Sequence, residues 1–511
     1  MIGTISRLLI AAGVISAVSL TAYADKVVIL HTNDTHSQIE PDGHDRGGVA
    51  RRKVLIDSVR AVEPNVILVD AGDAVQGSLY FTLFGGDVES KVMNEMGYDI
   101  QILGNHEFDN GIEWIADYWK GVNATKLATN YNLQGTPLDS MAVAYEIVKA
   151  GDRRIGFFAI NLDPNDIILD EKFGDIKYLD PVKAANSLAW YLKNVKNVDK
   201  VVAITHIGYA NENDLFNDRD LIKATDNIDI LIGGHSHTAI FPYGNKDEIV
   251  KPYYPNASGD SVLIAQTGRQ GFYLGQIDID FDKDNITSQL IPVDKRLDSR
   301  VDESLVRLIA PYKHVVDSIK AIKIGKVGQD MNTNEPALLN WMADYVYERG
   351  KTISGKNVDL AIVNKGGVRR PILKGDLTKG AVMETFPFEN KVVVLELKGD
   401  VLAEVFDTMA KRKGEGVSKN VDAVISPQND RCESVKISGK SIDPDKIYRV
   451  ATIDYLANGK DDMVGLKQGI ITHISPDLVY DDMIADFVSG KIKKRQMKYD
   501  GNRRMHYADE K

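Results

Sequence analysis

The stretch VVILHTNDTH at residues 27–36 joins an apolar, β-branched run to polar side chains that can bind metal. The same arrangement recurs four times, in VILVDAGD at 66–73, IQILGNHEFD at 100–109, VVAITHIG at 201–208 and ILIGGHSHT at 230–238. Each apolar run has the length and composition of a buried strand. The sequence therefore predicts that polar side chains from five strand ends meet in one place.

The residues at these strand ends are the donor types of a metal site. They are Asp34, His36, Asp73, Asn105, His206, His235 and His237. The pairs Asp34/His36 and His235/His237 have two-residue spacing, which on extended chain points both side chains to one side. The carboxylate of Asp73 can bridge two cations, with one oxygen to each. Mixed His, Asp and Asn ligands from five strands predict a two-metal site for phosphate ester chemistry.

The segment GNHEFDNG adds a candidate proton donor. His106 follows Asn105 directly, so it cannot easily point at the same metal. If a helix starts here, Asp109 lies on the same face as His106 and can hydrogen-bond to it. A histidine held by a carboxylate is prepared to donate a proton.

Each fragment alone has a simpler explanation. A lone Asp-x-His or Gly-Asp is typical of a turn, His206 resembles a core or loop histidine, and Asn105 can cap a helix. The glycine pair before His235 permits close backbone approach, which makes ILIGGHSHT the strongest fragment. Six of the ten histidines lie in the five motifs, which chance would rarely produce.

The chain of 511 residues is long enough for two domains. From residue 25 to about 298, apolar β runs alternate with helical stretches such as 49–62 and 181–195, which predicts a layered α/β domain. Residues 242–260, rich in Pro, Gly and Asn, are expected to form a surface loop. Residues 299–322 have helical spacing and predict a linking helix, interrupted or kinked near Pro311. Residues 323–511 predict a second, smaller α/β domain.

Residues 1–24 resemble a secretory signal, with Arg7 before an apolar run and a small-x-small site before Asp25. The alternative is a membrane anchor, but the run is short and interrupted by Gly and Ser, and no later stretch predicts a stable membrane span. Cys432 is the single cysteine, which fits a bacterial periplasm without disulfides. The formal charge of −11 argues against a nucleic acid polymer as partner.

The motifs D-x-H, GD, GNHE, H and GH-x-H, in this order, resemble the calcineurin-like metallophosphoesterases, and the whole chain is similar to the secreted bacterial 5′-nucleotidases. The resemblance implies a four-layer αββα first domain. It also implies two divalent ions, Zn or Mn most readily. One ion would be held by Asp34, His36, Asp73 and His237, and the other by Asp73, Asn105, His206 and His235.

The second domain carries VNKGGVRRPILKGDLT, METFPFENKVVVLELKG and ATIDYLANGKDDM. From the residues alone, Arg369 and Arg370 can either grip a phosphate or be solvated. The resemblance implies that Asn364 and Arg369 face a small nucleotide substrate, with Arg369 on its phosphate. It implies further that Phe388 and Tyr455 sandwich the base, and that Asp461 accepts hydrogen bonds from the ribose.

Three positions depart from the family pattern. Asn332 stands where many relatives have arginine, so that Arg370 or Lys365 is a possible replacement for a phosphate contact. Lys365 stands where a glycine is usual, and Tyr455 replaces the commoner phenylalanine, which preserves stacking. The favoured phosphate length therefore remains open.

The working hypothesis is a dinuclear-metal phosphohydrolase that acts on nucleoside 5′-monophosphates. A hydroxide shared by the two ions would attack phosphorus, with His106 and Asp109 as the catalytic pair. One alternative keeps the site but changes the substrate, to a 2′,3′-cyclic phosphodiester, a nucleotide sugar or pyrophosphate, or a sulfur compound. Another is a nucleotide-binding or adhesion protein that has lost catalysis.

Overall fold

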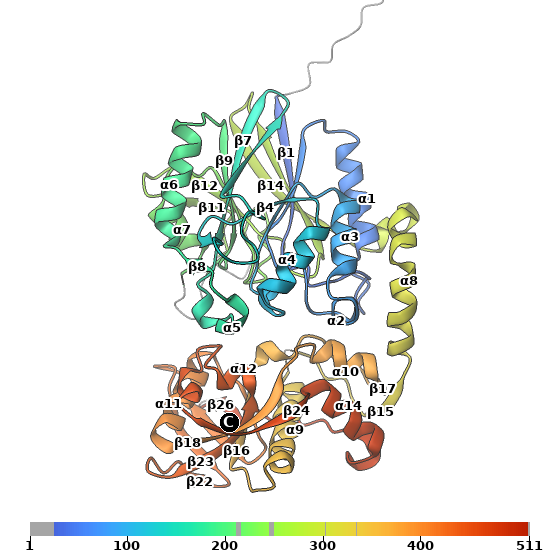
Figure 1. Cartoon of the computed structure of the whole chain (residues 1–511), viewed down its shortest axis with the longest axis vertical. Coiled ribbons are helices and arrows are strands. Elements are labelled where there is room, and N and C mark those ends of the chain that lie inside the picture. Colours follow the sequence, from blue (N-terminus) through green and yellow to red (C-terminus); the bar gives the residue numbers. More distant parts are fainter. Residues whose placement is uncertain (1–24, 211–215, 245–249, 302, 334, 509–511) are drawn as a thin grey trace, which may run out of the picture.

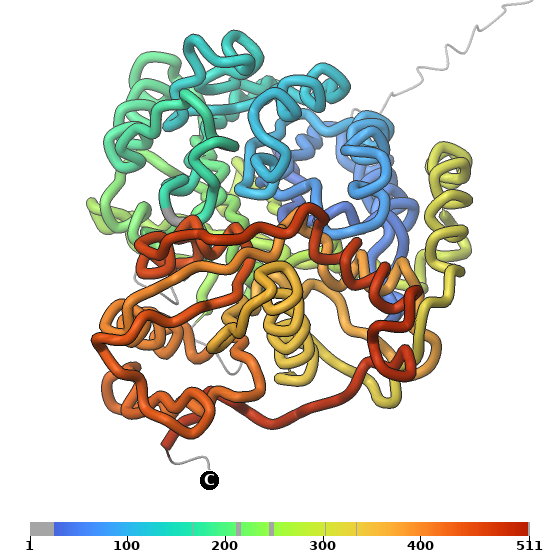
Figure 2. Tube along the Cα trace, turned by 60° about the horizontal axis from the view of Figure 1, so that its bottom comes forward, coloured from blue at the N-terminus to red at the C-terminus, as the bar shows by residue number. Residues whose placement is uncertain are grey.

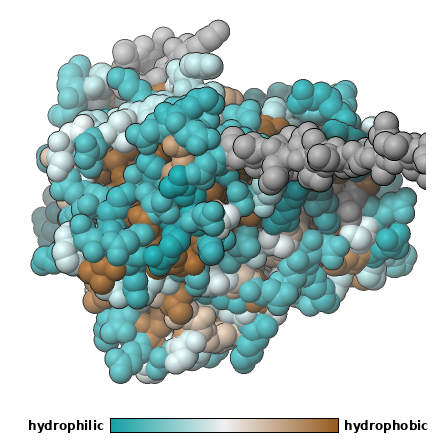
Figure 3. Space-filling model, turned by 90° about the horizontal axis from the view of Figure 1, so that it is seen from above, coloured by the Kyte–Doolittle hydropathy of each residue, from teal (hydrophilic) through white to brown (hydrophobic). Residues whose placement is uncertain are grey.

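In a computed structural model, residues 25–210, 216–244, 250–301, 303–333 and 335–508 are described. The expected signal at 1–24 lies outside the described residues. No helix in the described ranges is long and apolar enough to cross a membrane. The surface seen in Figure 3 is mostly hydrophilic, with scattered apolar areas.

Two six-stranded sheets form the centre of the N-terminal domain. The first has the order β14-β13-β1-β2-β3-β4 and the second β11-β12-β10-β9-β7-β6. The first sheet contains β1 Lys26–Thr32, β2 Val66–Asp70, β3 Ile100–Ile102, β4 Thr125–Leu127, β13 Tyr273–Asp280 and β14 Asn285–Pro292. The second contains β6 Tyr145–Ala150, β7 Arg153–Asn161, β9 Lys200–His206, β10 Ile230–Ile232, β11 Tyr253–Pro255 and β12 Ser261–Ala265.

The two sheets pack face to face between layers of helices (Figure 1). Alternating side chains of β1 serve two cores: Val27 and Ile29 join an inter-sheet cluster with Val202, while Val28 and Leu30 face a separate apolar cluster. The further elements are α1 Val49–Arg60, α2 Leu79–Phe84, α3 Asp87–Met96, η1 His106–Phe108, α4 Ile112–Gly121, β5 Tyr131–Asn132, η2 Pro164–Asp166, α5 Asp170–Phe173, β8 Lys177–Tyr178, α6 Pro181–Asn194, α7 Asp218–Ala224 and η3 Lys295–Arg300.

The segment at 242–260 is not wholly a loop, and that expectation is corrected. Tyr253–Pro255 forms the short edge strand β11, which pairs antiparallel with β12. An edge strand tolerates Pro255 because one side of it makes no ladder hydrogen bonds.

One helix, α8 Glu303–Lys320, connects the two domains along one side of the molecule (Figure 2). It continues through Pro311 as a single element, so the interruption, which was one of the two expected alternatives, is absent. Its buried side chains Leu305, Ile309 and Val316 follow helical spacing. It contacts α1, α2 and α3 of the first domain and α10 Lys379–Thr385 of the second.

The C-terminal domain contains a five-stranded sheet, β19-β16-β23-β18-β24, against which α9 Pro336–Ser354 packs. Smaller sheets of four and three strands complete it, in the orders β22-β21-β20-β26 and β17-β15-β25. The elements are β15 Lys323–Val327, β16 Leu360–Val363, η4 Lys365–Gly367, β17 Gly375–Thr378, β18 Lys391–Lys398, α11 Gly399–Lys411, β19 Gly416–Val417, β20 Val421–Ile425, β21 Cys432–Ile437, β22 Lys440–Ser441, β23 Ile447–Ile453, α12 Asp454–Ala457, α13 Val464–Lys467, β24 Ile470–Leu478, α14 Val479–Ser489, η5 Lys493–Arg495, β25 Gln496–Met497 and β26 Met505–Tyr507.

Candidate metal centre

The structure brings together the polar residues that follow β1, β2, β3, β9 and β10. In three groups the candidate ligand atoms lie within 4.8 Å of one another, namely Asp34/His36/His237, His36/Asp73/His106 and Asp34/Asp73/His206. Asn105 joins the cluster through His235: Oδ1 of Asn105 lies 2.9 Å from Nδ1 of His235. The five strand ends thus converge as the sequence predicts. The parallel strands β1, β2 and β3 end at one edge of the first sheet, β9 and β10 end at one edge of the second, and the packing of the two sheets brings these edges together.

The backbone at the cluster is strained. Five of the candidate ligands have left-handed φ values, which are 48° at Asp34, 47° at His36, 53° at Asp73, 73° at His235 and 56° at His237. Such values are uncommon for residues other than glycine and occur preferentially at functional sites. The surrounding hydrogen bonds therefore have to hold these loops in place.

Glu107 is central to that network, although the sequence analysis gave it no role. Its fully buried carboxylate accepts hydrogen bonds from the backbone N–H groups of Asp73 at 3.0 Å, Ala74 at 2.9 Å and Gly104 at 2.6 Å. Burial, with the nearby Asp73, raises the pKa of Glu107 to about 8. Glu107 thereby joins the loop after β2 to the loop after β3.

Two glycines allow the loops to approach this closely. A Cβ at Gly104 would lie 2.2 Å from Oδ1 of Asp73, and one at Gly234 would lie 2.6 Å from Nδ1 of His206. Either contact is impossible without a backbone shift. The prediction that a glycine before His235 permits close approach is therefore confirmed.

Asp73 and His206 form the buried centre of the cluster. Nδ1 of His206 donates to the carbonyl of Ala71 at 2.7 Å, which leaves Nε2 facing Oδ2 of Asp73 at 3.2 Å. Although burial acts to lower it, the carboxylates of Asp73 and Asp34 raise the pKa of His206 to about 10. Burial opposes ionisation of Asp73, but His206 and His106 hold its pKa well below the usual range.

The two carboxylate oxygens of Asp73 have different neighbours. Its Oδ1 accepts the backbone N–H of His106 at 2.8 Å. Its Oδ2 lies 3.2 Å from Nε2 of His206 and 3.9 Å from Nε2 of His36. Oδ1 is therefore already engaged by a backbone donor, whereas Oδ2 faces the two imidazoles.

The remaining imidazoles are suited to bind cations. Burial and the guanidinium of Arg369 hold the pKa of His36 well below its usual range, and burial with His206 lowers the pKa of His235 to about 4. Both rings are therefore neutral, which is the form that binds metal. Nε2 of His237 lies 3.0 Å from Nε2 of His36 and 3.4 Å from Asp34.

His106 and Asp109 make the predicted contact, with Nδ1 and Oδ2 3.0 Å apart. A short helix, η1, begins at His106, and Asn105 makes no side-chain capping bond. Its position next to Asn105 predicts that His106 lies apart from the ligands, yet a ring nitrogen of His106 belongs to a candidate group with His36 and Asp73. With Nδ1 taken by Asp109, the other nitrogen can serve as either donor or ligand.

The donor set fits divalent metal. Nε2 of His36 and Nε2 of His206 both face Oδ1 of Asp34 and Oδ2 of Asp73, at distances between 3.2 and 3.9 Å, so two imidazoles and two carboxylates point toward one buried place. Imidazole, carboxylate and amide oxygen together suit borderline cations. By contrast, His31 is a core histidine, fully buried with a pKa lowered to about 3 by burial.

A cavity of about 490 Å³ opens beside this cluster and is lined by both domains. Asp73, Asn105, His106 and His235 lie on one wall, and Arg369 belongs to the other. Nη2 of Arg369 lies 3.3 Å from His36 and 3.4 Å from His106. The second domain therefore delivers a guanidinium directly to the candidate metal centre.

The other expected substrate residues line the same cavity. They are Asn364, Phe388, Tyr455 and Asp461. Asp461 accepts from Asn364 at 2.7 Å and from the Tyr455 hydroxyl at 3.2 Å. The Phe388 ring stacks on His106, with centroids 5.7 Å apart. The residues expected to bind a nucleoside and the candidate metal ligands thus line one pocket.

Asn332 and Lys365, which depart from the family pattern, both form hydrogen bonds within the second domain. Asn332 donates to Glu335 at 3.0 Å, and Nζ of Lys365 donates to the carbonyl of Arg412 at 2.8 Å. Arg370 instead extends to Gln38 of the first domain. Arg370 is therefore better placed than Lys365 to act near the metal centre.

Sequence reasoning missed Arg412, whose guanidinium lies against Glu415, Asp461 and Asp462 at 2.9, 3.3 and 3.1 Å. It also missed the wall formed by Ile167, Ile168 and Leu169 of the first domain. An arginine in the polar run AKRKGEG carries no signal of its own: Glu415 is a local partner, but Asp461 and Asp462 come from a distant segment.

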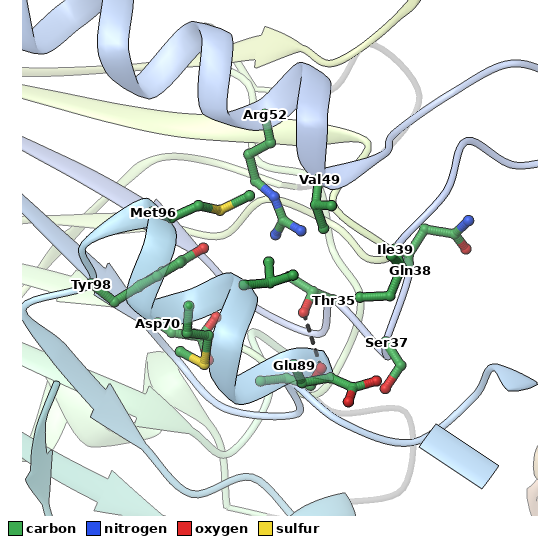
Figure 4. Close-up of a pocket in the computed structure, with 13 residues that line it drawn as sticks. Thr35, Ser37, Gln38, Ile39, Val49, Arg52, Asp70, Glu89, Met96 and Tyr98 are labelled. Carbon is green, nitrogen blue, oxygen red and sulfur yellow. Dashed lines mark hydrogen bonds between the residues drawn. The ribbon is translucent and has the colours of Figure 1, made fainter. Parts of the chain in front are cut away.

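A second, small cavity of about 20 Å³ lies behind the loop at 34–37 (Figure 4). Arg52, Asp70, Glu89 and Ser37 contribute its polar lining. Both carboxylate oxygens of Glu89 lack a hydrogen-bond partner among the described residues. Burial raises the pKa of Asp70 and of Glu89 to about 7, because a charged carboxylate is poorly solvated there.

Two family models match the chain. Residues 27–239 match the calcineurin-like phosphoesterases, and residues 318–468 match the 5′-nucleotidase C-terminal domain. The chain pairs a calcineurin-like phosphoesterase domain with a 5′-nucleotidase C-terminal domain. The first domain places the chain among the phosphoesterase enzymes, and the α/β fold expected for both domains is confirmed.

The chain is similar to proteins from animals and bacteria. A 5′-nucleotidase of Bos taurus is 27% identical over 93% of this chain and 89% of its own length. The 5′-nucleotidase precursor of Thermus thermophilus has a TM-score of 0.82 at 25% identity, covering 95% of this chain and all of that one. A sulfate thiohydrolase of Thermus thermophilus has a TM-score of 0.72 at 16% identity, covering 96% of this chain and 98% of that one. The similarity to the thiohydrolase concerns the fold alone, and a shared fold does not determine the reaction.

Proposed function

We propose that the chain hydrolyses nucleoside 5′-monophosphates and related small nucleotides, with two divalent cations as cofactors. The observation that carries this proposal is the shared cavity. The metal-site cluster forms one wall, and Arg369, Phe388, Tyr455 and Asp461 form the other. A phosphate beside the cluster and a nucleoside in the rest of the cavity would use every one of these groups.

The proposed ligand sets follow the family resemblance. One ion would be held by Asp34, His36, Asp73 and His237, and the other by Asp73, Asn105, His206 and His235. Zn and Mn suit this mixture of imidazole and carboxylate. When bound, such ions lower the pKa of water and neutralise charge on a phosphoryl group.

The chain's own residues would orient the substrate and move the proton. Arg369, between His36 and His106, would fix the phosphate oxygens through charged hydrogen bonds. Nε2 of His106 would carry a proton to the leaving ribose oxygen, while Asp109 fixes the ring through Nδ1.

The nucleoside would be held at the far end of the cavity. Phe388 and Tyr455 offer flat faces for stacking on any base, so we expect broad base selectivity. The carboxylate of Asp461, oriented by Asn364 at 2.7 Å, would accept hydrogen bonds from the ribose hydroxyls.

We also propose that the leader at 1–24 is removed during export and that the mature protein works in the periplasm. Its domains would be the phosphoesterase domain at 25–298, the linking helix at 299–322 and the substrate domain at 323–511.

A hydrolysis assay that measures released phosphate and also separates the nucleotide products by chromatography tests the proposed function. Purified protein is given AMP, UMP, ADP, UDP-glucose and cyclic nucleotides, before and after removal of metal with EDTA. We expect the highest kcat/KM for a 5′-monophosphate, loss of activity after EDTA treatment and recovery with Zn²⁺ or Mn²⁺. Equal hydrolysis after exhaustive metal removal would contradict the proposal, and a preference for cyclic nucleotides or UDP-glucose would reassign the substrate.

A further inference from the structure

A small lobe of the first domain, residues 163–173, is joined to the second domain by polar contacts. The lobe contains η2 and α5. Nζ of Lys460 donates to the carbonyl of Asn165 at 3.0 Å and to Oδ1 of Asp170 at 3.0 Å. The Tyr455 hydroxyl lies 3.3 Å from the carbonyl of Ile167.

Lys460 is unusual because it is a buried lysine, with 3% of its surface exposed. Lysine is almost never fully buried unless its ammonium is paired. Both hydrogen-bond acceptors of this ammonium belong to the other domain. The ammonium, through its hydrogen bond and charge, also lowers the pKa of Asp170. The contact therefore exists only while the lobe is seated against the loop that carries Lys460.

The seated lobe forms part of the nucleoside pocket. Ile167, Ile168 and Leu169 line the same cavity as Phe388 and Tyr455. Lys460 immediately precedes Asp461, which is the proposed ribose acceptor. The cavity wall around a nucleobase thus comes from both domains, although the stacking residues belong to only one of them.

We propose that Lys460 is a positioning residue for substrate selection, which seats the lobe at 163–173 as the second wall of the nucleobase pocket. This inference rests on the proposed nucleotidase function and deepens it. The lobe supplies apolar contacts that only a substrate with a base can use. Lys460 should therefore influence the binding of nucleotides and have little influence on phosphate esters that lack a base.

The test compares three substrates that share the phosphate but differ in the rest of the molecule. They are AMP, ribose 5-phosphate and p-nitrophenyl phosphate. In Lys460→Met we expect KM for AMP to rise roughly tenfold, as for the loss of one charged hydrogen bond, with kcat little changed. KM for ribose 5-phosphate and p-nitrophenyl phosphate should change less than twofold, because the first has no base and the second carries its ring directly on the phosphate, in the place of the ribose.

Lys467 provides a matched control, because it also lies near the carboxylate of Asp170. Nζ of Lys467 lies 3.9 Å from Oδ2 of Asp170, but its side chain is 58% exposed. Lys467→Met removes the same type of group without removing the buried contact, so the three KM values should stay as in the wild type. Lys460→Arg keeps the charge and should recover most of the affinity for AMP.

A second variant keeps the inference testable if Lys460→Met folds poorly. Asp170 has a side chain that is 77% exposed, so Asp170→Asn should fold normally. It should raise KM for AMP in the same direction. The double variant Lys460→Met/Asp170→Asn should be no worse than Lys460→Met, because both changes remove one interaction.

The outcomes separate the two proposals. If the wild type prefers AMP to ribose 5-phosphate and well-folded Lys460→Met keeps that preference, the role of Lys460 is overturned. An equal loss on all three substrates would also overturn it, since that result indicates a merely structural effect. If the wild type hydrolyses p-nitrophenyl phosphate but shows no preference for AMP, the proposed nucleotidase function and this inference both fail.

Discussion

The guanidinium of Arg369 lies 3.3 Å from Nε2 of His36, although the two residues are 333 positions apart in the sequence. His36 follows a strand of the phosphoesterase domain, while Arg369 follows a strand of the C-terminal domain. This contact closes the candidate site from both sides. A test of the reaction therefore needs both domains, because the first supplies His36 and the second supplies Arg369.

Asp73→Asn should abolish phosphate release, because it removes the carboxylate that faces both His206 and His36. The amide keeps the shape but loses the charge that a pair of cations needs. Metal content by mass spectrometry and kcat with AMP are the two measurements. Full activity in a well-folded Asp73→Asn protein would refute the two-metal interpretation.

His106→Ala should lower kcat by roughly 10²–10⁴-fold, the usual contribution of a positioned proton donor. Asp109→Asn is the matched control, because it keeps the ring but removes the charged partner at 3.0 Å, and a smaller loss is expected. The bound metal should stay near two ions per chain. Loss of metal from His106→Ala would instead reassign His106 as a ligand, a role that its position near His36 and Asp73 allows.

Phe388→Ala should raise KM for nucleotides far more than KM for p-nitrophenyl phosphate. The ring lines the shared cavity and presents a face for stacking on a base, which the small ester lacks. Steady-state kinetics with AMP, UMP and p-nitrophenyl phosphate provide the comparison. Equal increases for all three substrates would argue against stacking and for a role in supporting His106, on which Phe388 rests.

Glu89→Gln should change how stability depends on pH. Burial raises the pKa of Glu89 from 4.5 to about 7, so the folded chain keeps a proton that the unfolded chain has lost. The stabilisation is fully present below pH ~4.5 and is lost as pH rises to ~7, at up to ~1.4 kcal/mol per pH unit. Glutamine cannot titrate, so this loss should be absent from the variant.

The free energy of unfolding by urea, measured at pH 5 and at pH 7 at the same metal concentration, tests this prediction. Asp70, whose pKa is also raised to about 7, contributes to both proteins and cancels in the difference. The wild type should lose more stability than Glu89→Gln between the two pH values. Equal losses would show that Glu89 is ionised in the folded chain throughout this range.

Most strands of the first domain and the positions of their polar ends were predictable, because short sequence patterns determine them. Apolar runs ending in Gly-Asp or Gly-Asn-His indicate strands that turn sharply at their carboxyl ends, and parallel strands bring those ends together. The same logic predicted the contact between His106 and Asp109, since three-residue spacing on a helical turn is a local property. Tyr253–Pro255 was mistaken for loop because the strand has only three residues, and Pro255 with the Gly and Asn around it is typical of a turn.

The sequence by itself determined which residue types are available and which strand ends carry them: the candidate ligands, the His106–Asp109 pair and the aromatic residues of the second domain. Only the tertiary structure decided that Glu107 fastens two of those loops, that Arg369 reaches His36, and that Lys460 is buried against the lobe at 163–173. The physical reason is separation along the chain. Spacing reveals contacts within a turn or strand, whereas contacts between distant segments depend on how the sheets pack and how the two domains close on each other.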